Sequence, residues 1–362
     1  MAIELSNLTF TEQDDIVPQS GVQGILNTGI ANTLAGNDTI LGTKETIIDG
    51  SNQQVFTSIF NSGTLNTADG DDIITGTISH IESTGNYWGI YNIGSIYTGD
   101  GNDKIRSSGF YGLVNDFTIA TDNGNDIISG TGEGGGAGIS SQGKINSGDG
   151  DDIITGTNMS GSGYGIFNGF GTPDEIASTT LDTGDGNDII IGIAAYGIVN
   201  LGIINTGDGA DSIICDASSN NDTGYSFYNG GAINTGDGND LITEISGHSI
   251  FNPGIINTGN GADSIIAEGG FYEDSFNPPG SVFLGNGKDY LKGFGGGNFN
   301  GGNGKDTREL TSGSYTVEIS GTAVNFIKGS TIMNTSEFEK LIAGSTTYDF
   351  SSLTDGQTII VA

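Results

Sequence analysis

Apolar residues along this chain recur at fixed distances from a repeated polar turn. The turn reads T-G-D-G-N-D in its clearest copies, at 98–103, 183–188 and 235–240, and eleven copies align on a final aspartate. With that aspartate as position zero, Ile or Leu occupies position +2 in ten copies, and an apolar residue occupies position −7 in all eleven. Glycine occupies position −2 in every copy, where it permits a positive φ. The pattern predicts strand, turn and strand, with positions −7 and +2 in a shared core and the acidic turn at the surface.

A second apolar phrase, I-x-N-x-G, lies upstream of several turns, at 58–63, 89–94, 197–202 and 249–254, and adds a third short strand. Successive position-zero aspartates are 17 to 36 residues apart, and a separation of 23 recurs three times. About 23 residues suffice for three short strands with tight turns, which is one coil of a parallel β-helix. The extra residues fall in one corner, between position +4 and the next I-x-N phrase, as a solenoid tolerates.

We therefore predict an all-β chain that folds as a parallel β-helix of about 10–11 coils. The predicted divisions are an N-terminal cap over 1–20, the repeats over 21–310 and a β C-terminal cap over 311–362. Asparagines at position −6 should stack from coil to coil through amide hydrogen bonds. These are Asn66, Asn146, Asn205, Asn234, Asn257 and Asn300.

Charge restricts the possible partners. The 362 residues carry 44 acidic and 10 basic side chains, a formal net charge of −34, and no Lys or Arg lies between Lys144 and Lys288. Nucleic acid and anionic membrane surfaces are poor partners for such a chain. Cys215 is the only cysteine, so no disulfide can form within the chain. The N-terminal residues do not resemble a secretory signal peptide, and no apolar run is long enough to span a membrane.

Repeated carboxylates at one register position predict a column of sites for a hard cation. Position zero would supply the main carboxylate, and an acid at position −3 a second or water-mediated one. Two stacked turns, about 4.8 Å apart, would hold the ion between them, because one turn offers too few oxygens. The candidate ligands are Asp38, Asp69, Asp72, Asp100, Asp103, Asp126, Asp149, Asp152, Asp185, Asp188, Asp208, Asp211, Asp237, Asp240, Asp263, Asp289 and Asp306. Zn²⁺ prefers His and Cys, of which the chain has only His80, His248 and Cys215.

The phrase G-D-G-N-D-I-I resembles the RTX, or haemolysin-type, repeat G-G-x-G-x-D-x-U-x, over roughly residues 30–310. The resemblance implies several Ca²⁺ ions, held by Asp carboxylates and Gly-rich backbone carbonyls. It also implies secretion by a bacterium through an ABC-type exporter, directed by the C-terminal tail, although that tail also fits a simple edge-capping strand. RTX repeats usually run in tandem, two per coil, whereas most copies here occur about once per coil. We expect folding to require calcium, with a largely disordered chain when calcium is scarce.

Several functions remain open from the sequence. We expect a structural or adhesive role at the cell surface, with extracellular polysaccharide as a possible partner. A lyase-like or epimerase-like enzyme acting on polysaccharide is one alternative, although no catalytic motif occurs. Lys104 and Arg106 should point outward together as its best basic pair. The carboxylates outside the turns are Glu133, Asp174, Glu175, Glu244, Glu268, Glu273 and Asp274.

Aromatic residues suggest a glycan-binding module as a further alternative. They gather around the insertions and the I-x-N strand, at Tyr87, Trp88, Tyr91, Phe110, Tyr111, Tyr164, Phe167, Tyr225, Phe227, Tyr228 and Phe251. The competing interpretation places Phe167, Tyr228 and Phe251 in the core at one repeat position. The Thr column at position −5 raises ice binding as a third idea, but this position shares the inward parity of position −7.

Overall fold

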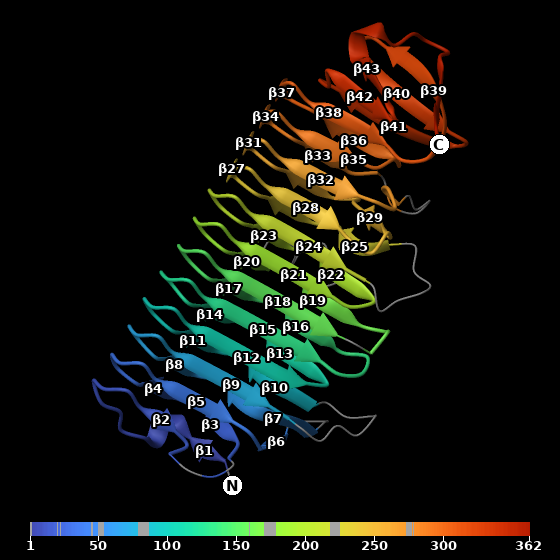
Figure 1. Cartoon of the computed structure of the whole chain (residues 1–362). Helices are drawn as coiled ribbons and strands as arrows, with labels where there is room; N and C mark the ends of the chain where they lie inside the picture. The colour runs from blue at the N-terminus through green and yellow to red at the C-terminus, as the bar shows by residue number, and fades with distance from the viewer. Residues whose placement is uncertain are drawn as a thin grey trace.

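The computed structural model describes residues 2–19, 21, 23–44, 46–49, 54–78, 87–158, 160–169, 179–217, 225–272, 277 and 279–362. It confirms the predicted parallel β-helix, because three sheets run side by side along one axis and most neighbouring strands in each are parallel (Figure 1). Most coils contribute one strand to sheet A, then one to sheet C, and after the acidic turn one to sheet B, while sheet A ends earlier than the other two, at β29.

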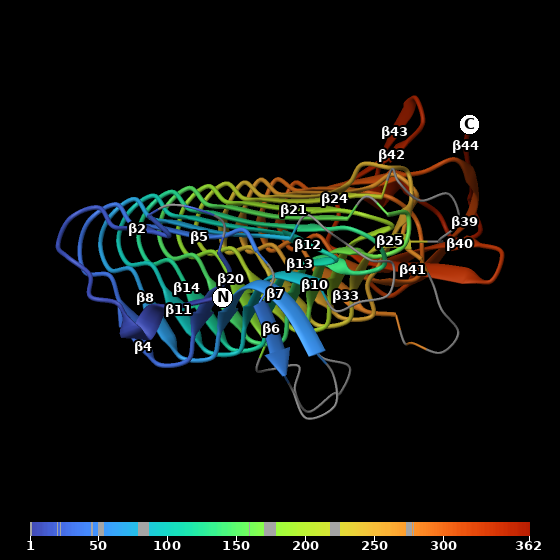
Figure 2. The same cartoon turned by 90° about the horizontal axis from the view of Figure 1, so that it is seen from below.

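Sheet A is built mainly from the strands of the I-x-N phrases. It contains β1 (Ile3–Glu4), β3 (Ile25–Asn27), β7 (Gln54–Asn61), β10 (Tyr87–Asn92), β13 (Tyr111–Asn115), β16 (Ala137–Ser141), β19 (Tyr164–Asn168), β22 (Tyr196–Asn200), β25 (Tyr225–Asn229) and β29 (Ser249–Phe251), and β6 (Thr46–Asp49) pairs with β7. The hairpin of β6 and β7 projects from the side of the solenoid in Figure 2.

Sheet C precedes the acidic turns and continues into the C-terminal strands. It contains β4 (Ile30–Asn32), β8 (Thr64–Asn66), β11 (Ser95–Tyr97), β14 (Thr118–Ala120), β17 (Lys144–Asn146), β20 (Thr180–Asp182), β23 (Ile203–Asn205), β26 (Ala232–Asn234), β30 (Ile255–Asn257), β33 (Ser281–Phe283), β36 (Gly297–Asn300), β41 (Thr331–Ser336), β40 (Ala323–Lys328), β39 (Gly313–Ser320) and β44 (Thr358–Val361).

Sheet B follows the acidic turns. It contains β2 (Ile16–Val17), β5 (Thr39–Gly42), β9 (Ile73–Thr77), β12 (Lys104–Gly109), β15 (Ile127–Gly132), β18 (Ile153–Asn158), β21 (Ile189–Ile193), β24 (Ser212–Asp216), β28 (Leu241–Glu244), β32 (Ser264–Ala267), β35 (Tyr290–Lys292), β38 (Thr307–Leu310), β42 (Lys340–Ala343) and β43 (Thr346–Asp349). Short 3₁₀ helices η1 (Leu5–Asn7) and η3 (Phe350–Ser352) lie near the two ends.

A fourth sheet, sheet D, is confined to the acidic turns of the C-terminal coils. It contains β27 (Asp237–Gly238), β31 (Asn260–Gly261), β34 (Asn286–Gly287) and β37 (Asn303–Gly304). Beyond β38, strands β39, β40, β41 and β44 pair antiparallel (Figure 1). β41 and β42 also pair parallel with β36 and β38, so they extend the stack on one side. No helix in the described part of the chain is long and apolar enough to cross a membrane.

The core is a set of stacked aliphatic columns in register. Position +2 residues such as Ile105 and position −7 residues such as Ile96 are fully buried, as predicted. Strand pairing places equivalent residues of successive coils opposite each other, with Ile105 opposite Ile74 in one neighbouring strand and opposite Ile128 in the other. This column of branched side chains supplies most of the apolar area removed from water.

Arg308 occupies position +2 in the last coil and is also fully buried. Its Nη1 donates to the carbonyl of Leu291 at 2.9 Å, and its guanidinium lies 5.3 Å from the centre of the Phe299 ring. Burial lowers the pKa of this arginine to about 9. The guanidinium therefore interrupts the aliphatic column and bonds to the carbonyls of the coil before it, while the buried Leu341 of β42 continues the column on its other side.

Asparagine ladders also hold the coils together, and the stronger ladder is the one that the sequence did not indicate. The Asn of each I-x-N phrase points inward. Its Nδ2 donates to the Oδ1 of the next one, for example from Asn61 to Asn92 at 2.7 Å and from Asn200 to Asn229 at 2.8 Å. In the predicted ladder at position −6, Asn234 donates to Asn205 at 2.9 Å. Both ladders bond side-chain amides that strand pairing leaves free.

Candidate metal column

The position-zero aspartates form one uninterrupted column inside the solenoid. All eleven are at least 98% buried, so the expectation that the whole acidic turn stays at the surface was wrong for this position. In most turns the backbone has positive φ at two positions before the inward aspartate. In the turn ending at Asp103 these are Gly99 and Gly101, with φ values of 85° and 152°, and in three other turns Leu34, Ala68 or Asp122 takes the first of these positions.

Each carboxylate in the column is held by the preceding coil. The backbone N–H of Asp72 donates to Oδ1 of Asp103 at 2.7 Å, and that of Asp103 donates to Oδ1 of Asp126 at 2.7 Å. The same bond, at 2.6–3.0 Å, links each of the eleven aspartates to the next along the chain. One carboxylate oxygen per coil is therefore used for stacking.

The second carboxylate oxygen of each inner aspartate, Oδ2, takes no part in this stacking. Oδ2 is buried without a hydrogen-bond partner in ten of the eleven aspartates: Asp38, Asp72, Asp103, Asp126, Asp152, Asp188, Asp240, Asp263, Asp289 and Asp306. In the eleventh, Asp211, Oδ2 accepts a bond from the Thr206 hydroxyl at 2.6 Å. A buried polar atom without a partner is costly. In eight of these coils the hydroxyl at position −5 lies close enough to lower the pKa of the carboxyl, as Thr67 does for Asp72. The column therefore keeps unused acceptor capacity at one register position, where a cation could be held.

Burial also changes the protonation of the column. Desolvation raises the pKa of Asp72 and of Asp188 to about 7, and that of Asp103 to about 6. Neighbouring aspartates of the column raise the pKa of Asp72 and Asp188 further, while the position −5 hydroxyl lowers it. No Lys or Arg is among the groups that shift these three pKa values. A buried carboxylate in this setting needs either a proton or a cation.

The column has two members that the sequence did not indicate. Asp15 lies 23 residues before Asp38, and its N–H donates to Oδ1 of Asp38 at 2.8 Å. Oδ2 of Asp15 accepts the N–H of Thr11 at 2.7 Å, which closes the N-terminal end. At the other end, Oε2 of Glu339 accepts the N–H of Asp306 at 2.7 Å. Neither residue ends a G-x-D phrase. The only feature of the sequence that could have indicated either of them is the 23-residue spacing between Asp15 and Asp38.

The acids at position −3 lie on the opposite side of the turn. Asp69, Asp100, Asp149, Asp185, Asp208 and Asp237 are exposed. They accept hydrogen bonds from the following coil, as Oδ1 of Asp185 accepts the N–H of Asp208 at 3.1 Å. The structure therefore does not bring the two predicted acids of one turn together. We name the position-zero aspartates the inner column and the side chains at positions −3 and −1 the outer columns.

No group of three or more His, Cys, Asp or Glu side chains in the described residues is arranged to hold a metal ion. A cation at the inner column would therefore take most of its oxygens from the backbone. Close stacking makes this feasible, because a Cβ added to Gly101 would lie 1.9 Å from the carbonyl oxygen of Gly70 in the coil before it. The donor set is all oxygen, which suits Ca²⁺ better than Zn²⁺.

The inward Thr column is confirmed as buried. Thr67, Thr98 and Thr183 at position −5 are at most 1% exposed and lie near the inner carboxylates. They form no outward-facing array. The last two coils carry Leu284 and Gly301 at this position instead.

Enzyme candidates outside the turns are scattered. Lys104 and Arg106 lie on the outer side of β12, as expected, while Glu133 is exposed at the end of β15. Glu268 is paired with Lys292 at 2.7 Å. His80, Asp174, Glu175, Glu273 and Asp274 lie outside the described residues.

A small polar cluster surrounds the buried Glu244. Its Oε1 accepts the N–H of Ser246 at 2.9 Å, and the Ser246 hydroxyl lies 3.2 Å from Nδ1 of His248. The serine therefore stands between the carboxylate and the imidazole. That order differs from a nucleophile, base and orienting acid in sequence, so this cluster does not form a catalytic triad.

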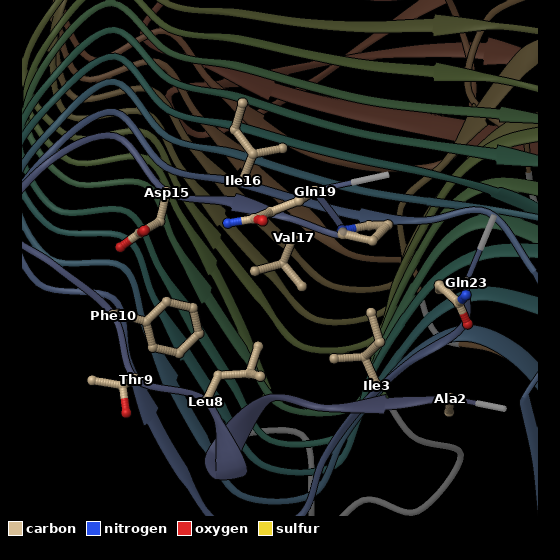
Figure 3. Close-up of a pocket in the computed structure, with 11 residues that line it drawn as sticks. Ala2, Ile3, Leu8, Thr9, Phe10, Asp15, Ile16, Val17, Gln19 and Gln23 are labelled. Carbon is tan, nitrogen blue, oxygen red and sulfur yellow. The ribbon is translucent and has the colours of Figure 1, made fainter. Parts of the chain in front are cut away.

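The N-terminal end of the core opens into a hollow of about 640 Å³ (Figure 3). Ile3, Leu8, Phe10 and Val17 line it, and Asp15 is the one ionisable residue among its lining. This hollow marks where the stacked aliphatic column stops rather than a second polar site.

Comparison with known proteins places the fold in context. No protein-family model matches the chain, and no curated protein matches its sequence. Among solved structures, a hyperactive, Ca²⁺-dependent, β-helical antifreeze protein from an Antarctic bacterium aligns over 83% of this chain and 78% of its own. The identity is 18% and the TM-score is 0.42, so this likeness supports no inference about what the chain binds.

Proposed function

We propose that this chain is a secreted bacterial protein that binds calcium along the inner column, requires it to fold, and serves a structural or adhesive role at the cell surface. The observation that carries the proposal is the set of ten buried Oδ2 atoms without a partner. Each ion would lie between adjacent coils, bound by an inner carboxylate and by backbone carbonyls of the turns.

Calcium fits this column better than other common ions. The available ligands are carboxylates and carbonyls, and the coil spacing leaves the geometry irregular. Ca²⁺ accepts six to eight oxygens at roughly 2.3–2.6 Å in flexible arrangements, whereas Mg²⁺ demands a near-ideal octahedron. The only cysteine, Cys215, is buried on β24, away from the turns.

Dependence of folding on calcium follows from the charges. Without an ion, the inner column stacks buried carboxylates at strand spacing, and the formal net charge of −34 opposes compaction. Ion binding removes both costs, so the free energy of binding becomes free energy of folding. A chain that stays unfolded where calcium is scarce also suits passage through an ABC-type exporter.

Native mass spectrometry combined with circular dichroism tests the proposal. We expect several Ca²⁺ ions per chain at millimolar calcium, and loss of the β signal when EGTA replaces calcium. Magnesium at the same concentration serves as the control and should restore the signal poorly. An unchanged β signal in EGTA would refute the proposal.

A further inference from the structure

The outer face of sheet A carries three groups of aromatic rings, one of which is formed by Tyr228, Phe251 and Tyr272. Phe167 and Tyr228 are half-buried on this face, so the core position suggested for them was wrong, whereas Phe251, in column with them, is buried. The adjacent Ile166 and Phe227 point inward. Alternation along the strand explains this, because Phe167 stands between two inward residues, Ile166 and Asn168.

The first group, the Trp88 cluster, contains Phe60, Trp88, Tyr91, Phe110 and Tyr111. Its rings contact one another edge-on or tilted, with centroids 4.1 Å apart for Trp88 and Tyr91 and 6.3 Å apart for Trp88 and Tyr111. The second group, the Tyr164 cluster, contains Tyr164, Phe167 and Tyr196, with centroids 5.2–5.5 Å apart. Trp88, Tyr91, Tyr111 and the three rings of the Tyr164 cluster remain partly exposed.

A ring-free strand separates the two clusters. On β16 the outward positions are Ala137 and Ser140, which pair with Tyr164 and Phe167 of β19. On its other side, Ser140 pairs with Val114 of β13. The strands that carry Tyr111 and Tyr164 are therefore two strand spacings apart, about 9.6 Å. Small side chains thus lie between two sets of rings along the solenoid axis.

The polar groups at the outward positions of these strands are hydroxyls, and the one carboxylate beside the Trp88 cluster, Asp116 just after β13, is hydrogen-bonded to the Tyr91 hydroxyl. No outward position of β10, β13, β16, β19 or β22 from Trp88 to Val199 carries a charge, on a chain with 44 acids. Within the described residues, the hydroxyls of Tyr111, Ser140 and Tyr164 have no hydrogen-bond partner. Rings with free hydroxyls beside them fit a ligand that has both apolar faces and hydroxyl edges.

From these observations we infer that the outer face of β10–β22 binds a neutral oligosaccharide, laid along the solenoid axis across the Trp88 and Tyr164 clusters. The C–H faces of the sugar rings pack on the aromatic rings, and their hydroxyls bond to Tyr111, Ser140 and Tyr164. The inference rests on the adhesive role proposed above and names its partner class. A second copy of the chain is a poorer occupant, because two bodies of net charge −34 repel each other.

Trp88 makes the test direct, since it is the only tryptophan of the chain. The calcium-loaded full chain is titrated with cellohexaose or maltohexaose as neutral probes and with hexagalacturonate as the acidic probe, while Trp88 emission is recorded. We expect a saturable change with at least one neutral hexaose and none with the acidic one. Tyr164→Ala should weaken binding about tenfold, and Tyr164→Phe, which keeps the ring, only a few-fold.

Matched variants separate this face from the others. Tyr97→Ala removes a ring of the same kind from sheet C and should leave binding unchanged. Ser140→Arg places bulk and charge on the ring-free strand and should abolish binding, with the calcium-dependent circular dichroism intact. If Tyr164→Ala does not fold, hexaose binding by Ser140→Arg tests the inference in its place.

Three results would overturn the inference: no emission change with either neutral hexaose, preferential binding of hexagalacturonate, or a dimer in analytical ultracentrifugation that Ser140→Arg dissociates. The calcium proposal is judged separately by circular dichroism in EGTA. A chain that folds without calcium yet binds a neutral hexaose refutes the calcium proposal and leaves this inference standing.

Discussion

The middle and the C-terminal coils share the same inner column but differ in the outer columns. From the turn ending at Asp72 to that ending at Asp240, positions −3 and −1 carry eight acids and no base: Asp69, Asp71, Asp100, Asp149, Asp151, Asp185, Asp208 and Asp237. In the three turns ending at Asp263, Asp289 and Asp306, the same positions carry no acid and two lysines, Lys288 and Lys305. The outer formal charge is thus −8 in the middle and +2 at the C-terminal end.

Hydrogen bonding differs in the same way. The turn segments of the C-terminal coils pair as sheet D, whose first strand, β27, belongs to the neighbouring turn that ends at Asp240. An amide ladder runs along the C-terminal part of this sheet, with Nδ2 of Asn303 donating to Oδ1 of Asn286 at 2.8 Å. In the middle, backbone N–H groups donate to outer carboxylates instead, as Asn187 does to Asp151 at 2.8 Å. Under the function proposed above, the inner column would hold the ions, and the outer columns would determine how much charge repulsion accompanies them.

Removing calcium should separate the two regions most strongly. With EGTA, we expect the amides of β9–β24 to exchange with deuterium within seconds, because the inner carboxylates and the eight outer acids repel without an ion. Amides from β31 to β44 should stay protected far longer, since their outer charge is +2 and the buried Tyr315, Phe326 and Phe350 pack beside them. Hydrogen exchange read by mass spectrometry measures this. Equal exchange across both regions would show that outer charge is irrelevant.

Two substitutions in one coil distinguish inner from outer acids. Asp152→Asn removes an inner carboxylate, so we expect about one ion fewer per chain. At calcium 100-fold above the dissociation constant, that loss costs about 2.7 kcal/mol of stability. Asp149→Asn changes an outer acid three residues away and should leave the ion count unchanged. Native mass spectrometry gives the counts, and an equal loss in Asp149→Asn would make the outer aspartates ligands, as first predicted from the sequence.

Register was predictable from the sequence, whereas side-chain direction at the turn was not. Ile96 and Ile105 recur at fixed distances from each aspartate, and a coil can stack on its neighbour only if such positions coincide. The direction of Asp103 depends on the φ angles of Gly99 and Gly101, which the letters alone do not give. The buried Oδ2 atoms that lack a hydrogen-bond partner can be recognised only once the coils are stacked in three dimensions.

The ends of the column escaped prediction for a related reason. Asp15 and Glu339 join it through their backbone and side-chain geometry, although neither follows a glycine at position −2. At the Glu339 turn, Glu337 stands at position −2 with a φ of 57°, whereas the positive-φ glycines at that position have values of 130–157°. A search for the G-x-D phrase passes over this turn because both its residue and its backbone conformation differ from those of the repeats.

Replacing the two outer lysines by aspartates tests how much the outer charge matters in the C-terminal coils. The double variant Lys288→Asp and Lys305→Asp makes the outer charge there −2, so we expect the calcium midpoint of folding to rise about threefold. The control, Lys144→Asp, changes an exposed lysine on β17, outside the turns, and should have no such effect. Circular dichroism during calcium titration gives the midpoints. An unchanged midpoint in the double variant would confine the role of charge to the inner column.

The amide ladder of sheet D should contribute least. Asn303→Ala deletes one exposed hydrogen bond, to Asn286, and leaves Asp306 and its N–H bond to Glu339 in place. One such bond is worth about 0.5–1.5 kcal/mol when buried, and less here because water can replace the lost partner. We therefore expect a small drop in melting temperature in calorimetry with calcium present, well below that of Asp152→Asn. A loss as large as that of Asp152→Asn would mean that sheet D, and not its favourable charge, distinguishes the C-terminal coils.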